Sequence, residues 1–152
     1  LFDIVSNFNS SSYGKLFVSG FEIWKKNPIN GVGVKNFRLE CDIQLQNREP
    51  LHHPLCSTHP HNLYLEMLSE TGIIGSTLFI AFLILIYKFF LKNITQINIK
   101  NKFILFALII SFTTLIWPIS TSGSFFTTWN GSFYWLILGL LILNQNLILS
   151  KK

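Results

Sequence analysis

The chain has 152 residues, of which 49% are hydrophobic and only 12% are charged, and its formal net charge is +5. Soluble domains carry about 25% charged residues, so this composition argues against an ordinary soluble domain. The positive excess lies after residue 71, where six lysines flank apolar runs and no acidic residue occurs. A nucleic-acid-binding protein would gather its basic residues on one soluble face, so we expect membrane lipids, and not nucleic acid, as the partner of these lysines.

The first 70 residues are mostly polar and hold one amphipathic stretch. Its apolar side chains recur with the helical spacing of four and three residues at Phe17, Phe21 and Trp24. We expect a short helix here that lies against the membrane surface. The Asn-Pro pair and two glycines of residues 27–37 then predict a turn. Because the chain begins with leucine and shows no signal-peptide pattern, we interpret it as the C-terminal piece of a longer protein.

The two cysteines, Cys41 and Cys56, lie in a stretch that we expect to be an irregular loop, residues 39–60. An oxidising compartment would permit a disulfide between them. The bond would close a loop of about 15 residues and stabilise the fold by about 3 kcal/mol. Two unpaired thiols are the alternative, but no third cysteine competes for pairing, so we predict the disulfide.

Four histidines fall within ten positions, at His52, His53, His59 and His61. Zinc binds histidine and cysteine, so a metal site with Cys56 as a further ligand is one interpretation. The spacing matches no standard zinc pattern, however, and a disulfide would consume the thiol. We therefore predict no metal site and regard His52 and His53 as solvated loop residues.

After Pro60 the pattern becomes helical, and Ser57 or Thr58 could supply the helix cap. Polar residues recur every fourth position along this helix, at Asn62, Glu66 and Glu70. Such a stripe at the entrance to a membrane helix must face water, protein or a ligand, because lipid penalises polar groups. His61 stands at its head, and an imidazole pKa of about 6.5 suits proton transfer at neutral pH. On these grounds His61 is either a general base or a structural, capping histidine.

Three apolar runs follow, over roughly 72–91, 103–119 and 132–149. A helix of about 20 residues crosses the hydrocarbon core of a bilayer, so the first run fits well and the others are near the short limit. Buried helices of a soluble protein are the alternative, but too little polar surface would remain to cover them. The sequence predicts an all-α, multi-pass integral membrane protein, with a loop segment over 1–70 and a membrane domain over 71–152.

The lysines predict the topology of these runs. They lie between the first two runs, in residues 92–102, and at the end of the chain, Lys151 and Lys152. Positive charge marks the cytoplasmic side of a membrane, and both clusters fall on one side if all three runs cross it. The C-terminus is then cytoplasmic, whereas residues 1–70 and the loop 120–131 lie on the opposite side.

Two motifs, in this order, resemble those of the O-antigen ligase/polymerase family of multi-pass membrane glycosyltransferases. The first is WKKNPINGVGVKNF, residues 24–37, and the second is HPHNLYLEMLSETGIIG, residues 59–75. The family pattern His-Asn-x-x-Leu-x-x-Leu-x-Glu-x-Gly-x-x-Gly is matched at His61, Asn62, Leu65, Leu68, Glu70, Gly72 and Gly75. The resemblance covers roughly residues 13–91.

The resemblance implies an enzyme of the bacterial inner membrane. Such enzymes transfer a glycan from undecaprenyl diphosphate to an acceptor hydroxyl on the periplasmic side, without a nucleotide sugar, metal or other cofactor. The acceptor is a lipid A–core sugar for a ligase and another lipid-linked repeat unit for a polymerase. Transfer to a protein hydroxyl is a third option, and the sequence does not separate the three.

The resemblance also implies roles for single residues. The family histidine corresponds to His61, which would activate the acceptor hydroxyl, and we expect Asn62 and Glu70 of the same motif to bind substrate. Arg38 directly follows the first motif, and arginine binds phosphate bidentately, so we expect it to hold the diphosphate. A membrane-surface anchor is the alternative for Arg38. Lys15 stands where the family often has arginine and would bind phosphate as a point charge.

Two non-enzymatic functions compete with this interpretation. A transporter subunit should place ionisable residues in the middle of its spans, and the three runs have none there. A metal-binding periplasmic sensor would instead use the histidines and cysteines of the loop. We favour the enzyme.

Overall fold

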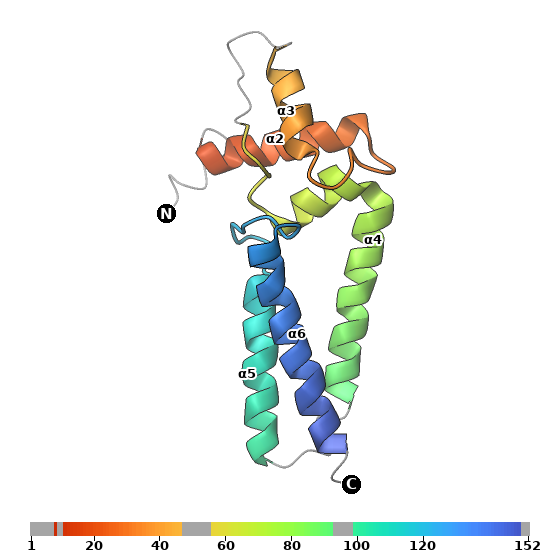
Figure 1. The fold of residues 1–152 in the computed structure, drawn as a ribbon, viewed down its shortest axis with the longest axis vertical. Coiled ribbons are helices and arrows are strands. Elements are labelled where there is room, and N and C mark those ends of the chain that lie inside the picture. Colours follow the sequence, from red (N-terminus) through yellow and green to blue (C-terminus); the bar gives the residue numbers. More distant parts are fainter. Residues whose placement is uncertain (1–7, 9–10, 47–55, 93–98, 150–152) are drawn as a thin grey trace.

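The computed structural model describes residue 8 and the ranges 11–46, 56–92 and 99–149. Secondary structure in these ranges is helical and includes no strand, which confirms the predicted all-α class. Figure 1 shows the five labelled helices: α2 (Ser12–Lys26), α3 (Phe37–Gln46), α4 (Leu63–Lys92), α5 (Ile99–Leu115) and α6 (Thr128–Leu149).

The long helices α4, α5 and α6 run lengthwise, α2 lies across one end of them, and α3 rises beyond α2 (Figure 1). Apolar side chains from the three long helices form the larger core, with Leu83, Leu105 and Leu141 among its buried members. A smaller core under α3 holds Ile23, Phe37 and Cys41. The molecule thus has two parts. We call residues 11–46 and 56–71 the cap, and we call α4 from Gly72 onward, together with α5 and α6, the stem.

One helix in the described part of the chain, α4, is long and apolar enough to cross a membrane by length and composition. The apolar part of α5, Asn101–Leu115, is shorter. The prediction of three transmembrane helices is therefore not confirmed beyond the first. The predicted bounds also differ, because α5 ends at Leu115 and α6 begins earlier, at Thr128. Pro118 explains the earlier end of α5, because the residue before a proline disfavours helical backbone.

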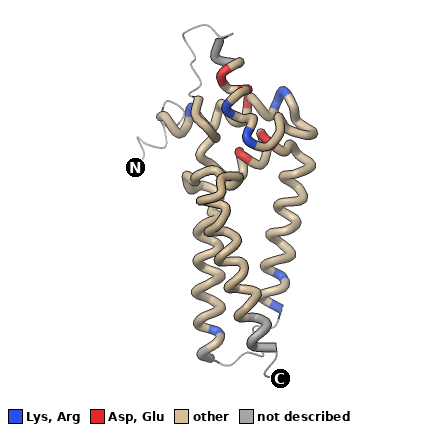
Figure 2. The backbone as a smooth tube through the Cα atoms, viewed as in Figure 1, with Lys and Arg blue, Asp and Glu red and all other residues tan. Residues whose placement is uncertain are grey.

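Large apolar side chains point outward along the stem. Leu78, Leu85, Phe103 and Ile110 are each at least 63% exposed. In Figure 2, charged residues lie in the cap and near the far end of the stem, and the length between them is free of charge among the described residues. An uncharged, outward-facing apolar surface of this kind fits lipid contact better than water.

The predicted amphipathic helix is confirmed as α2. Ser11 caps it, because its Oγ accepts a hydrogen bond from the Gly14 backbone N–H at 3.0 Å. The buried face of α2 consists of small and aliphatic residues: Gly14, Leu16, Ser19, Gly20 and Ile23. The predicted aromatic stripe lies off this face, and Phe21 is 41% exposed. This second apolar face is free to lie against a membrane surface.

The irregular loop predicted for residues 39–60 is wrong in its first part, where α3 begins at Phe37 and ends at Gln46. Its first turn is held from a distance, because the carboxylate of Glu70 accepts hydrogen bonds from the Lys35 and Phe37 backbone N–H groups. Nothing near α3 in the sequence indicates that Glu70 holds the start of this helix. Residues 47–55, which include His52 and His53, lie outside the described part of the chain.

Candidate functional site

His61 occupies an unusual backbone position directly before α4. Its φ of 54° lies in the left-handed region, which is uncommon for residues other than glycine, although asparagine, aspartate and histidine adopt it more often than the rest. Such conformations persist where surrounding contacts impose them, and they cluster at functional sites. One of these contacts is a hydrogen bond from the Ser122 N–H to the His61 carbonyl oxygen, at 3.0 Å.

The ring of His61 is half-buried between three other side chains. Its Nε2 lies 3.2 Å from the hydroxyl oxygen of Ser57. The ring of Tyr13, from α2, meets it edge-on with centroids 6.0 Å apart, and the ring of His59 lies 4.1 Å away. The Ser57 hydroxyl therefore lies at hydrogen-bonding distance from Nε2, and an acceptor hydroxyl would take its place.

His59 is fixed by two hydrogen bonds. Its Nε2 donates to the carbonyl oxygen of Ser122 at 3.2 Å, and its Nδ1 lies 3.0 Å from the hydroxyl oxygen of Thr58. A carbonyl oxygen can only accept, so Nε2 carries the proton. In the neutral ring Nδ1 is then the acceptor of the Thr58 hydroxyl.

Burial keeps both histidines neutral. It lowers the pKa of His61, and the neighbouring His59 lowers it further because two positive rings would repel each other. Burial also lowers the pKa of His59, although the hydrogen bond to Ser122 acts in the opposite direction. Near neutral pH His61 therefore has a free lone pair and can accept a proton.

Asn62 begins α4, in place of the cap predicted at Ser57 or Thr58. Its Oδ1 accepts hydrogen bonds from the Tyr64 and Leu65 N–H groups, each at 3.1 Å. Its Nδ2 donates to the Pro118 carbonyl at 2.7 Å and to the Ser120 carbonyl at 3.4 Å. The side chain is 4% exposed, so it acts as a cap that also holds the α5–α6 loop. Its expected role in substrate binding stays a prediction.

Glu66 and Glu70 continue the polar stripe and are both 1% exposed. Glu66 accepts a hydrogen bond from the Phe125 N–H through Oε2 at 2.8 Å. Glu70 accepts from the Lys35 N–H through Oε2 at 2.7 Å and from the Phe37 N–H through Oε1 at 3.4 Å. The sequence predicts that the stripe faces water, protein or a ligand, and the structure shows that these two carboxylates face protein. Substrate binding by Glu70 stays a prediction.

The two sequence motifs meet at a kink in α4. Gly72 has a φ of 66° and interrupts the helix, which frees backbone groups on either side. The turn of the first motif pairs with these groups, because the Val32 N–H donates to Ser69 O at 3.0 Å and the Ile73 N–H to Pro28 O at 2.9 Å. A Cβ at Gly72 would collide with the Ile29 carbonyl oxygen. The first motif thus shapes the point where the apolar part of α4 begins.

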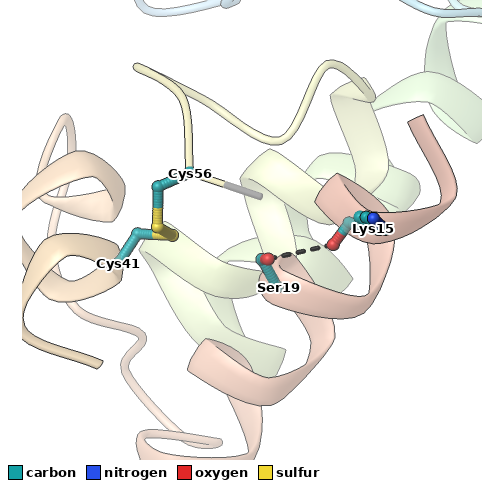
Figure 3. Close-up of a disulfide and its surroundings, with 4 residues drawn as sticks. All are labelled: Lys15, Ser19, Cys41 and Cys56. Carbon is teal, nitrogen blue, oxygen red and sulfur yellow. Dashed lines mark hydrogen bonds between the residues drawn. A yellow bond between two sulfur atoms is a disulfide. The ribbon is translucent and has the colours of Figure 1, made fainter. Parts of the chain in front are cut away.

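A disulfide joins α3 to the segment that carries the histidines. The Cα atoms of Cys41 and Cys56 are 5.7 Å apart, and Cys41 is buried. Figure 3 draws this bond together with Lys15 and Ser19 of α2, where the Ser19 hydroxyl donates to the Lys15 carbonyl. The bond holds α3 close to residues 57–61.

The expected phosphate-binding residues have exposed side chains in the cap. Arg38 is the second residue of α3, three positions before Cys41. Lys15 lies on α2, two positions after Tyr13, whose ring contacts His61. Both are free to meet an anion from solvent or a membrane surface. Within the described ranges, no three His, Cys, Asp or Glu side chains gather closely enough to hold a metal ion.

The comparison with protein families matches the part of the chain that forms this site. A family described as O-antigen ligase matches residues 5–80, which include both motifs, α2, α3 and the first half of α4. The chain belongs to the O-antigen ligase family. No curated protein and no solved structure matches the chain. The resemblance inferred from the two motifs is thereby confirmed.

Membership in the O-antigen ligase family implies a membrane-bound, glycosyltransferase-like enzyme. In general terms, it implies lipid-linked glycans and lipid A–core as partners. The apolar helix α4 agrees with a membrane location. Helices α5 and α6 begin after the matched residues, and the α5–α6 loop contacts the second motif at residues 59–66.

Sequence reasoning missed several residues around His61. The spacing of two histidines around Pro60 could have signalled His59, because a short, rigid segment keeps their rings close. Tyr13 and Ser122 carried no usable signal, since their contacts join segments far apart in the chain. Glu66 was predicted as part of the polar stripe, but its partner Phe125 was not.

Proposed function

We propose that this protein transfers a glycan from undecaprenyl diphosphate to an acceptor hydroxyl on the periplasmic side of the bacterial inner membrane. The observation that carries the proposal is His61, a half-buried ring with a lowered pKa and an Nε2 that a hydroxyl already reaches. It stands on the family motif, a few residues before the apolar part of α4. This is where a lipid-bound diphosphate and an acceptor from the outer leaflet would meet.

In the proposed reaction His61 acts as general base. The acceptor hydroxyl gives its proton to Nε2, and its oxygen forms a bond to the anomeric carbon of the donor sugar. The bond from that carbon to the diphosphate oxygen breaks, and the electron pair leaves with undecaprenyl diphosphate. A single displacement of this kind inverts the configuration at the anomeric carbon. The neutral state of His61 near pH 7 suits this step.

The leaving diphosphate needs positive charge close to it. We assign this role to Arg38, whose planar guanidinium can bind two phosphate oxygens at once, with Lys15 as a second cation. Both side chains are exposed in the cap, on the helices that flank the histidine segment. Asn62 and Glu70 contribute by holding the α5–α6 loop and the turn before α3 in place.

We further propose that α4, α5 and α6 all cross the membrane. The ends of α4 and α6 and the start of α5 lie at the same end of the stem (Figure 1). Lys88 and Lys92 belong to the last turns of α4, and Lys102 belongs to the first turn of α5. That end would face the cytoplasm, since lysines gather on the cytoplasmic side. The cap, with residues 1–70, would then be periplasmic.

The test is deletion of the encoding gene, followed by complementation with the full-length wild type or with His61→Asn. Asparagine tolerates the left-handed backbone but is not a base at neutral pH, so the variant should insert normally and fail to transfer. Lipopolysaccharide gels give the readout, and immunoblots of membranes control for protein level. Glycan ladders from His61→Asn equal to those of the wild type would refute the role of His61.

The same gels separate the possible acceptors. Loss of the whole ladder on deletion, with lipid-linked polymer accumulating, would indicate a ligase. Collapse to a band with a single repeat would indicate a polymerase. An unchanged ladder would contradict both and would direct the search to glycosylated proteins, or to the transporter and sensor alternatives.

A further inference from the structure

A small pocket with polar and apolar walls opens on the α5–α6 loop, which contacts both histidines through Ser122. Its volume is about 210 Å³. Pockets for drug-sized ligands measure about 300–1,000 Å³, so this one suits a smaller group, such as a single sugar ring. The lining residues that could contact a ligand are Ser120, Thr121, Ser122, Asn130, Phe133 and Tyr134.

An exposed residue with a hydroxyl, Thr121, borders this pocket. The Oγ atom of Ser122, in contrast, is buried and makes no hydrogen bond within the described part of the protein. A ligand in the pocket would therefore meet the hydroxyl of Thr121 and would not reach that of Ser122.

The chemistry of the lining selects a neutral ligand. The pocket is bordered by hydroxyls, one amide and two aromatic rings, and no charged residue occurs between Lys102 and Lys151. The buried Glu66 accepts a hydrogen bond from the N–H of Phe125 on the same loop, and no positive side chain borders the pocket. A phosphate or carboxylate is therefore disfavoured, whereas a sugar offers hydroxyls for the polar groups and an apolar face for the rings.

Ser122 also connects the pocket to the proposed base. Its N–H donates to the carbonyl oxygen of His61 at 3.0 Å, and its carbonyl oxygen accepts from Nε2 of His59 at 3.2 Å. The backbone of one residue thus contacts both histidines, and the same residue borders the pocket. We propose that this pocket binds a neutral sugar ring of the acceptor glycan, next to the ring whose hydroxyl His61 deprotonates. This inference rests on the proposed function.

Steady-state transfer by the full-length enzyme in membranes tests the assignment, with purified lipid-linked donor and acceptor varied separately. Thr121→Ala removes an exposed hydroxyl of the lining. We expect the acceptor KM to rise roughly five- to tenfold, the value of one hydrogen bond, with kcat and the donor KM nearly unchanged. The Tm should not fall, because no protein group loses a partner. Ser111→Ala is the matched control, since its hydroxyl binds its own helix and lies outside the pocket.

Asn130→Ala provides a second pocket variant and should raise the acceptor KM in the same way. An unchanged acceptor KM in both variants would overturn the assignment, as would an increase confined to the donor KM. A fall in kcat and Tm together would indicate a purely structural role and would also overturn it. If the wild type itself transfers no glycan, the proposed function fails, which distinguishes that outcome from failure of the pocket alone.

Discussion

The contact between His59 and His61 determines how readily the proposed base becomes protonated. Their ring centroids are 4.1 Å apart, and His59 is one of the two causes of the lowered pKa of His61. The proximity follows from the short His-Pro-His segment and from Ser122, whose backbone contacts both residues. His59 is therefore a positioning residue that also acts through its charge.

Replacement of His59 by asparagine tests this coupling. A base must be neutral to act, so transfer by the wild type should decline only below a pH that lies under the ordinary histidine value of about 6.5. At acidic pH His59 becomes positive, and His59→Asn removes this charge. The pKa of His61 should then rise, so that the acidic limb of the plot of kcat/KM against pH moves to higher pH. The measurement is kcat/KM against pH for both proteins. A limb that stays in place or moves to lower pH would contradict the coupling.

At the scale of elements, the kink in α4 and the turn of the first motif form one unit. Gly31 and Gly72 approach so closely that a Cβ on Gly31 would lie 2.6 Å from the Gly72 nitrogen. The backbone groups freed at the kink are paired with residues 28–33. The turn therefore fixes the angle between the segment that carries His61 and the apolar part of α4.

We expect Gly72→Ala to lower the free energy of unfolding by more than about 1–2 kcal/mol. That is the cost of left-handed backbone for alanine alone, and the collision with the Ile29 carbonyl adds to it. Gly139→Ala is the matched control, because no heavy atom lies within 4 Å of its added Cβ and alanine favours a helix. Thermal unfolding of the purified protein in detergent gives the comparison. Equal stability of the two variants would mean that the kink is not held as described.

Local patterns predicted the elements that depend on neighbours in the sequence. The helix α2, the helix after Pro60 and the pairing of two motifs with a known family all follow from short-range spacing. The helix α3 could not be predicted, because its first N–H groups are held by Glu70, which lies 33 and 35 residues further along the chain. The partners of the polar stripe of α4 also lie far away in the sequence, so the stripe indicated a contact but not its partners. Likewise, nothing in the sequence indicated that Ser122 contacts both histidines.

At the scale of the whole molecule, the polar stripe of α4 connects the cap with the stem. Asn62 and Glu66 hold the α5–α6 loop, and Glu70 holds the turn before α3. The loop between the last two helices is therefore attached to the histidine segment from below, while α2 and the disulfide-linked α3 cover it from above (Figure 1). Both arrangements place the proposed active site at one end of the stem.

Labelling of introduced cysteines can test the three-span topology, because α4 is the one helix of the described residues that is long and apolar enough to cross a membrane. If α4, α5 and α6 all cross, the α5–α6 loop is periplasmic and the start of α5 is cytoplasmic. A cysteine introduced at Thr121 should then react with a membrane-impermeant maleimide in intact spheroplasts, whereas one at Lys102 should react only after permeabilisation. Cys41 and Cys56 should give little background, since the disulfide occupies both. If only α4 crossed, both introduced cysteines would lie on the cytoplasmic side, and a protected Thr121→Cys would thus refute the second and third spans.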